Sequence, residues 1–287
     1  MIKDMACKFA NSVLEPAAKA LDRGDDKAAE RALFLHNLQQ LAELGFMGLN
    51  VKSEYGGSDA GVVAFSLAIT QVARVCASTA VTMSVTNMVG EVIQAIASEE
   101  QKQRYLPQLC SGNYAAGSFC LSEAEVGSDP AGMKTSAVLD NNEWVLNGTK
   151  MWISSAEYAG IFVVCAVTDP MAAKGKGISC FLVEAGTPGL IIGKAEEKMG
   201  QHGSATNTVI FDDCRVPKSA LMGELNDGFR IALSELSGGR IGIGSLALGI
   251  GQSAMDYARR YTTERQQFGS SISDLQGPQW MMADAYT

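Results

Sequence analysis

The spacing of apolar residues changes twice along this chain, and that change constrains its fold more than any other feature. In residues 1–112, apolar side chains recur at steps of three or four, the spacing of one helix face. In residues 113–222 the step shortens toward two, which is typical of strands. Helical spacing returns in residues 223–287. The sequence therefore predicts a multi-domain α and β protein. An N-terminal all-helical domain, a middle β-barrel or β-sandwich domain and the start of a C-terminal helical bundle follow in that order.

The first region predicts several helices. Two amphipathic stripes lie in residues 9–21 and 33–44, and Gly45 follows the second as a stop signal. Two largely apolar helices, expected to be central, are predicted over residues 61–80 and 82–97. Ser98-Glu-Glu-Gln101 is a capping box that opens a further helix, and Pro107 is expected to end or kink it.

The middle region predicts short strands at residues 144–147, 161–167, 178–183 and 208–211. Asp140-Asn-Asn-Glu143 and Asn147-Gly148 have the composition of hairpin turns. Strands of this length and spacing favour a compact barrel or sandwich.

The C-terminal region predicts one long helix over residues 229–264 and a second that begins near Asp274. One and a half helices cannot close a core, so we expect the chain to be C-terminally truncated. Residues 242–247 match the GxGxxA letters of a dinucleotide-binding turn, but no strand precedes them. The small residues there are better explained by close packing of this helix on a neighbour.

Composition excludes several classes of function. The net charge of −8 argues against a nucleic-acid-binding protein, which would usually carry a basic face. No apolar run approaches the roughly 18 residues of a membrane helix, and the first residues show no signal-peptide pattern. The two histidines, His36 and His202, exclude a histidine-rich metal site and argue against Ser-His-Asp catalysis.

The seven cysteines are an odd number and contain no CxxC pair. Several lie in apolar stretches, which predicts buried thiols in a reducing compartment. We therefore expect a cytoplasmic protein if the source is bacterial, or a mitochondrial matrix protein if it is eukaryotic.

Two segments combine hydroxyl side chains with strand ends. One runs from Phe119 to Asp129 and carries Ser122 and Ser128, and the other is Met151-Trp-Ile-Ser154. The hydroxyls could fix the polar edge of a planar aromatic ligand while the indole covers its face. The alternative is an ordinary edge of the β domain with a buried tryptophan. The residues alone leave both interpretations open.

These segments resemble motifs of the acyl-CoA dehydrogenase family of flavoproteins. The resemblance rests on Phe119-Cys-Leu-Ser-Glu-Ala-Glu-Val-Gly-Ser-Asp129, Lys150-Met-Trp-Ile-Ser154 and Glu264-Arg-Gln-Gln-Phe-Gly269. Shorter matches occur in the family's order along the whole chain, including Gly238-Gly-Arg-Ile241. Ala124 and Glu125 depart from the family's pattern and add a charge to the first motif.

The resemblance implies a role for individual residues. Ser122 and Ser154 would hydrogen-bond the flavin edge, and Trp152 would pack against the ring. The remaining FAD contacts implied are Phe119, Leu121, Gly127, Ser128, Ile153, Arg265, Gln267, Phe268 and Gln276. Of these, Arg265, Gln267 and Phe268 would reach the diphosphate and adenosine end of FAD across a subunit interface. Ser128, Ser237 and Arg240 would contact the acyl-CoA substrate.

Some branched-chain members carry the catalytic glutamate at the position of Gly239, which has no side chain. The resemblance therefore implies no catalytic base within the chain and a glutamate beyond Thr287. The implied reaction is FAD-dependent α,β-dehydrogenation of short- or branched-chain acyl-CoA thioesters, with the proton taken by that glutamate and the hydride by flavin N5. An electron-transfer flavoprotein and a homotetramer are the implied partner and assembly. Two alternatives stay open: an inactive truncated fragment, and a flavin-binding relative with oxidase-type chemistry.

Overall fold

The computed structural model describes residues 1–287, and its N-terminal region is helical as predicted. The helices are α1 (Ile2–Phe9), which continues through a π-helical turn into α2 (Glu15–Arg23), then α3 (Lys27–Glu43), α4 (Gly61–Ala73), α5 (Ala77–Ile96) and α6 (Glu99–Cys110). The capping box is confirmed, since the Ser98 hydroxyl accepts from Gln101 N–H and the Gln101 side chain accepts from Ser98 N–H.

Two helix boundaries differ from the prediction. The break between α4 and α5 lies at Arg74–Cys76 rather than near residue 81, because Cys76 adopts an extended backbone. Both helices are apolar, so periodicity alone does not mark the break. Pro107 lies inside α6 without ending it. Leu106 and Leu109 are fully buried there, and their packing offsets the loss of one helical N–H.

The middle region forms one eight-stranded sheet. Its strands are β1 (Ala116–Cys120), β2 (Ser136–Asp140), β3 (Glu143–Ser154), β4 (Ala159–Val167), β5 (Ile178–Glu184), β6 (Leu190–Ala195), β7 (Thr206–Pro217) and β8 (Leu221–Met222). The order is β6-β7-β3-β2-β4-β5-β8, and β1 pairs with β4 in parallel. β4 separates two cores: Ile161, Val163 and Cys165 face one, and Phe162, Val164 and Ala166 face the other.

One of the two predicted turns is confirmed and the other is wrong. Asp140 and Glu143 close the hairpin between β2 and β3. Asn147-Gly148 lies inside β3 instead, where the register with β7 shifts. Gly148 has a φ of +147°, and a Cβ there would lie 2.5 Å from Thr135 Oγ1. The glycine therefore serves a bulge and a close approach rather than a turn.

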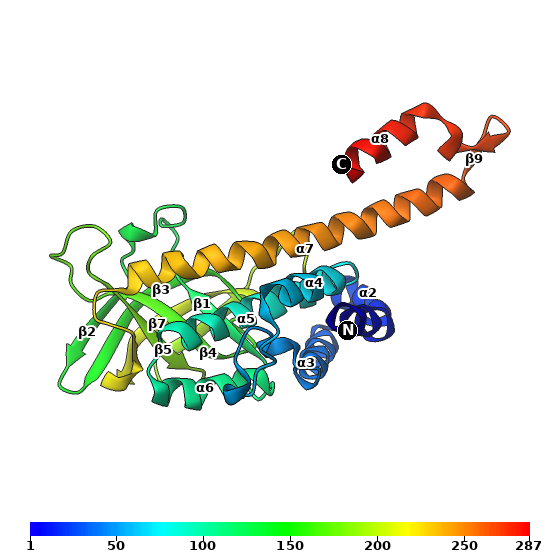
Figure 1. Cartoon of the computed structure of the whole chain (residues 1–287). Helices are drawn as coiled ribbons and strands as arrows, with labels where there is room; N and C mark the ends of the chain where they lie inside the picture. Colours follow the sequence, from blue (N-terminus) through cyan, green and yellow to red (C-terminus); the bar gives the residue numbers. More distant parts are fainter.

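A single helix, α7 (Gly228–Glu264), follows the sheet and crosses α4 and α5 (Figure 1). A Cβ at Gly242 would lie 2.1 Å from Ser84 Oγ, and one at Gly249 would lie 2.4 Å from Thr70 O. These contacts confirm that the small residues of this segment allow close helix packing. No helix in the chain is long and apolar enough to cross a membrane.

Beyond α7 lie a small hairpin of β9 (Gln266–Gln267) and β10 (Ser270–Ser271) and then α8 (Gln276–Tyr286). Figure 1 shows this end projecting away from the other helices and the sheet. At 1.5 Å per residue, a helix of this length spans roughly 55 Å. The hairpin is therefore carried far from the sheet.

Two carboxyl groups meet where α7 crosses α5. Glu235 of α7 is only 7% exposed, and its Oε1 has no hydrogen-bond partner. Burial and the nearby charge of Glu91 on α5 raise the pKa of Glu235 to about 8. Burial also raises the pKa of Glu91, although Asn50 Nδ2 donates to its Oε1 at 2.5 Å. Glu235 therefore binds a proton near neutral pH.

We expect Glu235→Gln to stabilise the protein at alkaline pH only. The folded-state pKa lies above the ordinary value of 4.5. The contribution of Glu235 to the free energy of unfolding is therefore fully present below pH 4.5, and it is lost as the pH rises through 8. The neutral amide removes this loss, so the variant should gain about 1–3 kcal/mol at pH 9 and little at pH 4.5. Urea unfolding at both pH values measures the difference. Glu264→Gln, an exposed change on the same helix, is the control. Equal gains at both pH values would contradict this assignment.

Candidate functional site

Ser122, Trp152 and Ser154 lie together at one end of the sheet. Ser122 follows β1, while Trp152 and Ser154 belong to β3. Met151 N–H donates to Ser122 O at 2.9 Å and joins the two segments. A second link is the 2.8 Å hydrogen bond from Ser118 Oγ to Ser154 O. The structure thus places both predicted hydroxyls and the indole on neighbouring backbone.

Trp152 points out of the core. Its φ is +63°, and the register between β3 and β7 shifts between Lys150 and Ile153. The side chain is 59% exposed, whereas the adjacent Ile153 is buried. The alternative of an edge strand with a buried tryptophan is therefore wrong. Positive φ is costly for a residue with a side chain and is commonly retained at functional sites.

The loop of residues 121–135 is fixed from within by Lys150 and Glu123. Lys150 is fully buried, and its Nζ donates to Leu121 O at 3.1 Å and to Glu123 Oε1 at 2.8 Å. Glu123 also accepts the N–H groups of Lys134 at 2.7 Å and Thr135 at 2.9 Å. Burial would raise the pKa of Glu123, but hydrogen bonds from Lys150 and Thr135 hold it below its usual value.

Lys150 and Glu123 were not among the predicted site residues. Both stand inside the two motifs quoted above, but motif letters do not show which side chains pair. The available signal was the alternation of the strand, which places Lys150 on the same buried face as Trp144 and Leu146, since a buried lysine requires a partner.

The outer part of the same loop is exposed. Gly127 and Ser128 lie at its surface, and a Cβ at Gly127 would meet nothing within 4 Å. The charge of Glu125 is paired locally, with its Oε2 2.6 Å from Lys134 Nζ. Glu125, which differs from the family's pattern, therefore adds no unpaired charge to the site.

On α7, Ser237 and Arg240 are exposed, and the Ser237 hydroxyl donates to Leu233 O. Gly239 lies between them, against α5. A Cβ at Gly239 would lie 2.8 Å from Met88 Sδ. Gly239 therefore packs against the flexible end of the Met88 side chain and offers no carboxylate at this position.

Within one chain, the remaining predicted residues do not join this site. Arg265, Gln267 and Phe268 lie in or beside the β9–β10 hairpin at the far end of α7, and Gln276 begins α8. All four are exposed, and Phe268 is 93% exposed. α7 carries these four residues away from the sheet, so they are not brought together with Ser122, Trp152 and Ser154 (Figure 1).

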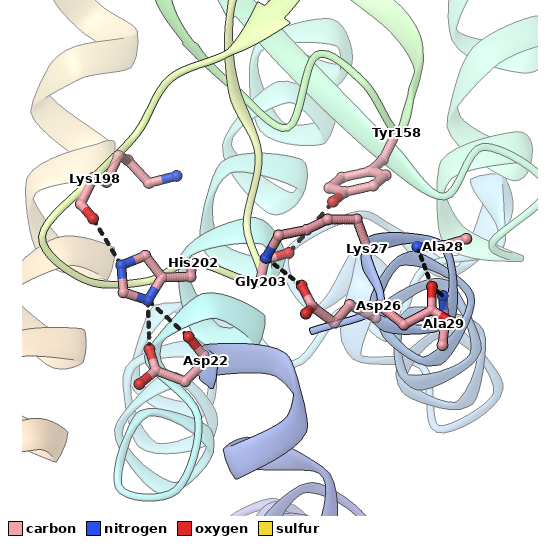
Figure 2. Close-up of polar contacts among 10 residues, drawn as sticks. Asp22, Asp26, Lys27, Ala28, Ala29, Tyr158, Lys198, His202 and Gly203 are labelled. Carbon is pink, nitrogen blue, oxygen red and sulfur yellow. Dashed lines mark hydrogen bonds and ion pairs between the residues drawn. The ribbon is translucent and has the colours of Figure 1, made fainter. Parts of the chain in front are cut away.

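A cavity of about 610 Å³ opens elsewhere, between the α2–α3 region and the loop joining β6 to β7 (Figure 2). Most of its charges are paired: Arg31 Nε lies 2.7 Å from Glu157 Oε1, and Lys27 Nζ lies 2.7 Å from Glu30 Oε2. Because these pairs neutralise the lining, we assign this cavity to the junction of the helical and β regions rather than to a ligand.

His202 closes one side of this cavity (Figure 2). Its Nε2 lies 2.7 Å from Lys198 O, and its Nδ1 lies 2.9 Å from Asp22 Oδ1. Both ring nitrogens face acceptors, so the protonated ring is favoured. The Lys198 carbonyl and the Asp22 carboxylate accordingly raise the pKa of His202.

Comparison with known families gives a consistent match along the chain. Residues 1–113 match the N-terminal domain of acyl-CoA dehydrogenase, residues 118–214 match its middle domain, and residues 226–287 match its C-terminal domain. The matched ranges include both β segments of the site and all of α7.

Two curated relatives illustrate the similarity. Acryloyl-CoA reductase (NADH) of Anaerotignum propionicum is 42% identical over 290 residues, covering 100% of this chain and 71% of the relative. The mitochondrial short-chain specific acyl-CoA dehydrogenase of Homo sapiens is 42% identical over 278 residues, covering 96% of this chain and 65% of the relative.

Solved structures agree. Butyryl-CoA dehydrogenase from Megasphaera elsdenii superposes with a TM-score of 0.92 at 34% identity, covering 99% of this chain and 74% of that one. An acyl-CoA dehydrogenase complexed with FAD from Bacillus anthracis gives a TM-score of 0.90 at 32% identity, covering 99% of this chain and 47% of that one.

The positive φ of Trp152 predicts an unusual order of stability for two substitutions. Glycine normally destabilises a strand relative to alanine. At this φ alanine bears the steric cost and glycine does not, so Trp152→Gly should be more stable than Trp152→Ala by about 1 kcal/mol. Chemical denaturation of both variants measures the difference. An alanine variant at least as stable as the glycine variant would show that the backbone is unstrained.

The geometry of His202 predicts an acid-dependent contribution to stability. Because its folded-state pKa is raised, its stabilisation is present below the ordinary value of 6.5 and is lost as the pH rises through the folded pKa. His202→Gln should therefore lower the melting temperature more at pH 5.5 than at pH 8.5. His36→Gln controls for the removal of one histidine. A loss that is equal at both pH values would refute this role.

Proposed function

Because the chain belongs to the acyl-CoA dehydrogenase family of FAD-dependent oxidoreductases, we propose that it catalyses α,β-dehydrogenation of short- or branched-chain acyl-CoA thioesters. The resemblance seen in the sequence is thereby confirmed at the level of the family. The observation that carries the proposal is the exposed Trp152 beside the hydroxyls of Ser122 and Ser154. The chain spans 71% and 65% of the two curated relatives described.

The residues present fit a flavin. Ser122 and Ser154 offer hydroxyl donors for the nitrogen and oxygen atoms at the ring edge, and Trp152 offers an exposed aromatic face. Phe119, Leu121, Gly127 and Ile153 flank these groups and would supply packing or backbone contacts. When bound, FAD supplies the hydride acceptor of the reaction.

Ser128, Ser237 and Arg240 are the proposed substrate contacts. Ser128 lies on the exposed part of the loop after β1, where it can lie between FAD and the pantetheine of acyl-CoA. Ser237 and Arg240 present polar groups on the exposed surface of α7. Removing a weakly acidic α proton requires hydrogen bonds to the thioester carbonyl and a site that excludes water. We assign no proton-accepting carboxylate to position 239 of α7, because Gly239 has no side chain.

The preference for short acyl groups is supported by the named relatives. One is a reductase of acryloyl-CoA and another a dehydrogenase of butyryl-CoA, and the human relative is named short-chain specific. We propose an electron-transfer flavoprotein as the electron acceptor.

We also propose a homo-oligomer, with a tetramer as the expected form. Arg265, Gln267, Phe268 and Gln276 are exposed at the far end of α7. In an oligomer these four residues could contact the FAD of a neighbouring subunit, and no residue within one chain prevents this. Size-exclusion chromatography with light scattering measures the assembly.

The native gene product tests the proposed activity. We expect it to bind FAD and to reduce an electron-transfer flavoprotein with butyryl-CoA or isobutyryl-CoA. Ser122→Ala should weaken FAD binding roughly tenfold, since it removes one hydrogen bond to the ring edge. Ser111→Ala, an exposed hydroxyl after α6, is the control. A native product without FAD affinity would refute the proposal, and rapid reoxidation by oxygen with no transfer to the flavoprotein would favour oxidase chemistry.

A further inference from the structure

We propose that Lys150 and Glu123 are positioning residues, whose buried ion pair holds the backbone of Ser122 and that of Trp152 in the one arrangement that a flavin requires. The inference rests on the proposed function, because it concerns the same FAD site. It assigns a role to two side chains that would not themselves touch the cofactor.

The two segments of the site have no strand pairing between them. β1 pairs with β4, while β3 pairs with β2 and β7. The segment after β1 and the bulge of β3 are therefore connected only by local contacts. Lys150 supplies two of these contacts from the β3 side, to Leu121 O and to the Glu123 carboxylate.

These contacts enclose Ser122 on both sides. Its neighbours Leu121 and Glu123 are both bonded to Lys150 Nζ, and its own carbonyl accepts from Met151 N–H. Glu123 N–H is also bonded to Val126 O at 3.0 Å. The backbone around Ser122 is thus fixed, while its hydroxyl stays available for a ligand.

Lys150 is itself the residue from which the bulge begins. The register with β7 shifts directly after it, and Trp152 follows with its positive φ. Anchoring Nζ to the loop after β1 therefore fixes the starting point of the strained segment. Together with the Met151 N–H bond to Ser122 O, this anchor gives the indole and the Ser122 hydroxyl a defined spacing.

The burial of this pair argues against a purely stabilising role. The exposed fractions of its side chains are 0% for Lys150 and 8% for Glu123. The exposed ion pair of Lys134 and Glu125 lies on the same loop, with both side chains 76% exposed. An apolar pair of similar volume often stabilises a core at least as well as a buried ion pair. A directed pair with three further hydrogen bonds, to Leu121 O and from the N–H groups of Lys134 and Thr135, instead specifies one backbone conformation.

Variants of both residues separate positioning from stability. Lys150→Met alone leaves Glu123 buried and unpaired, so it should lower the melting temperature by more than about 5 °C. The double variant Lys150→Met/Glu123→Gln removes both charges and should recover most of that loss. We nevertheless expect it to bind FAD at least tenfold more weakly and to change the visible circular dichroism of the bound flavin. Lys134→Met/Glu125→Gln, which removes the exposed pair, should change neither property.

A double variant with native FAD affinity and a native flavin spectrum would overturn the inference. If the double variant does not fold, Lys150→Arg keeps the charge but cannot reproduce the same contacts in the same space. It should show faster amide exchange across residues 121–135 together with weaker FAD binding, and faster exchange with unchanged affinity would overturn the inference. Failure of the proposed function looks different, because the native protein itself would then bind no FAD.

Discussion

The buried ion pair of Lys150 and Glu123 is the interaction on which the candidate site depends. It joins the segments after β1 and within β3, two strands that do not pair with each other in the sheet. Removing one partner of such a pair typically costs about 3–5 kcal/mol, because the other charge stays buried. Around it, the exposed face of Trp152 and the free hydroxyls of Ser122 and Ser154 become a surface of fixed shape. The sheet is the rigid support, and the Lys150–Glu123 ion pair fixes where Trp152 and Ser122 lie on it.

The architecture could be predicted from apolar spacing, because helices and strands bury different periods of side chains. The long α7 and the strands β3, β4, β5 and β7 lie where the spacing placed them. The predictions that failed have one physical cause: a local sequence pattern does not show which residue, distant in the sequence, contacts a given side chain. Gly148 looked like a turn, but Thr135 requires a glycine there. Lys150 was recognised only as part of a motif, because the sequence does not show that its side chain pairs with Glu123.

α7 shows how packing overrides helix propensity. Glycine in a helix interior costs about 1 kcal/mol relative to alanine. α7 nevertheless carries several glycines, and those at 242 and 249 lie against α5 and α4 too closely for a side chain. The same closeness buries Glu235 beside Glu91 and keeps it protonated near neutral pH. The crossing therefore decides both where α7 requires glycine, at positions 242 and 249, and what α7 must tolerate at position 235, a buried carboxyl group.

The parallel pairing of β1 with β4 sets an order of events during synthesis. Phe119 pairs with Val163, and Thr149 of β3 pairs with Ile210 of β7. The segment after β1 thus leaves the ribosome before β4, which pairs with β1, and before β7, which pairs with β3. Parallel pairing between distant strands is intrinsically slow, because the loop must close before any contact forms. The cofactor surface is consequently completed only after β7 has been translated, so a nascent chain that stalls earlier would expose the core residues against which Val209, Phe211 and Val216 of β7 pack.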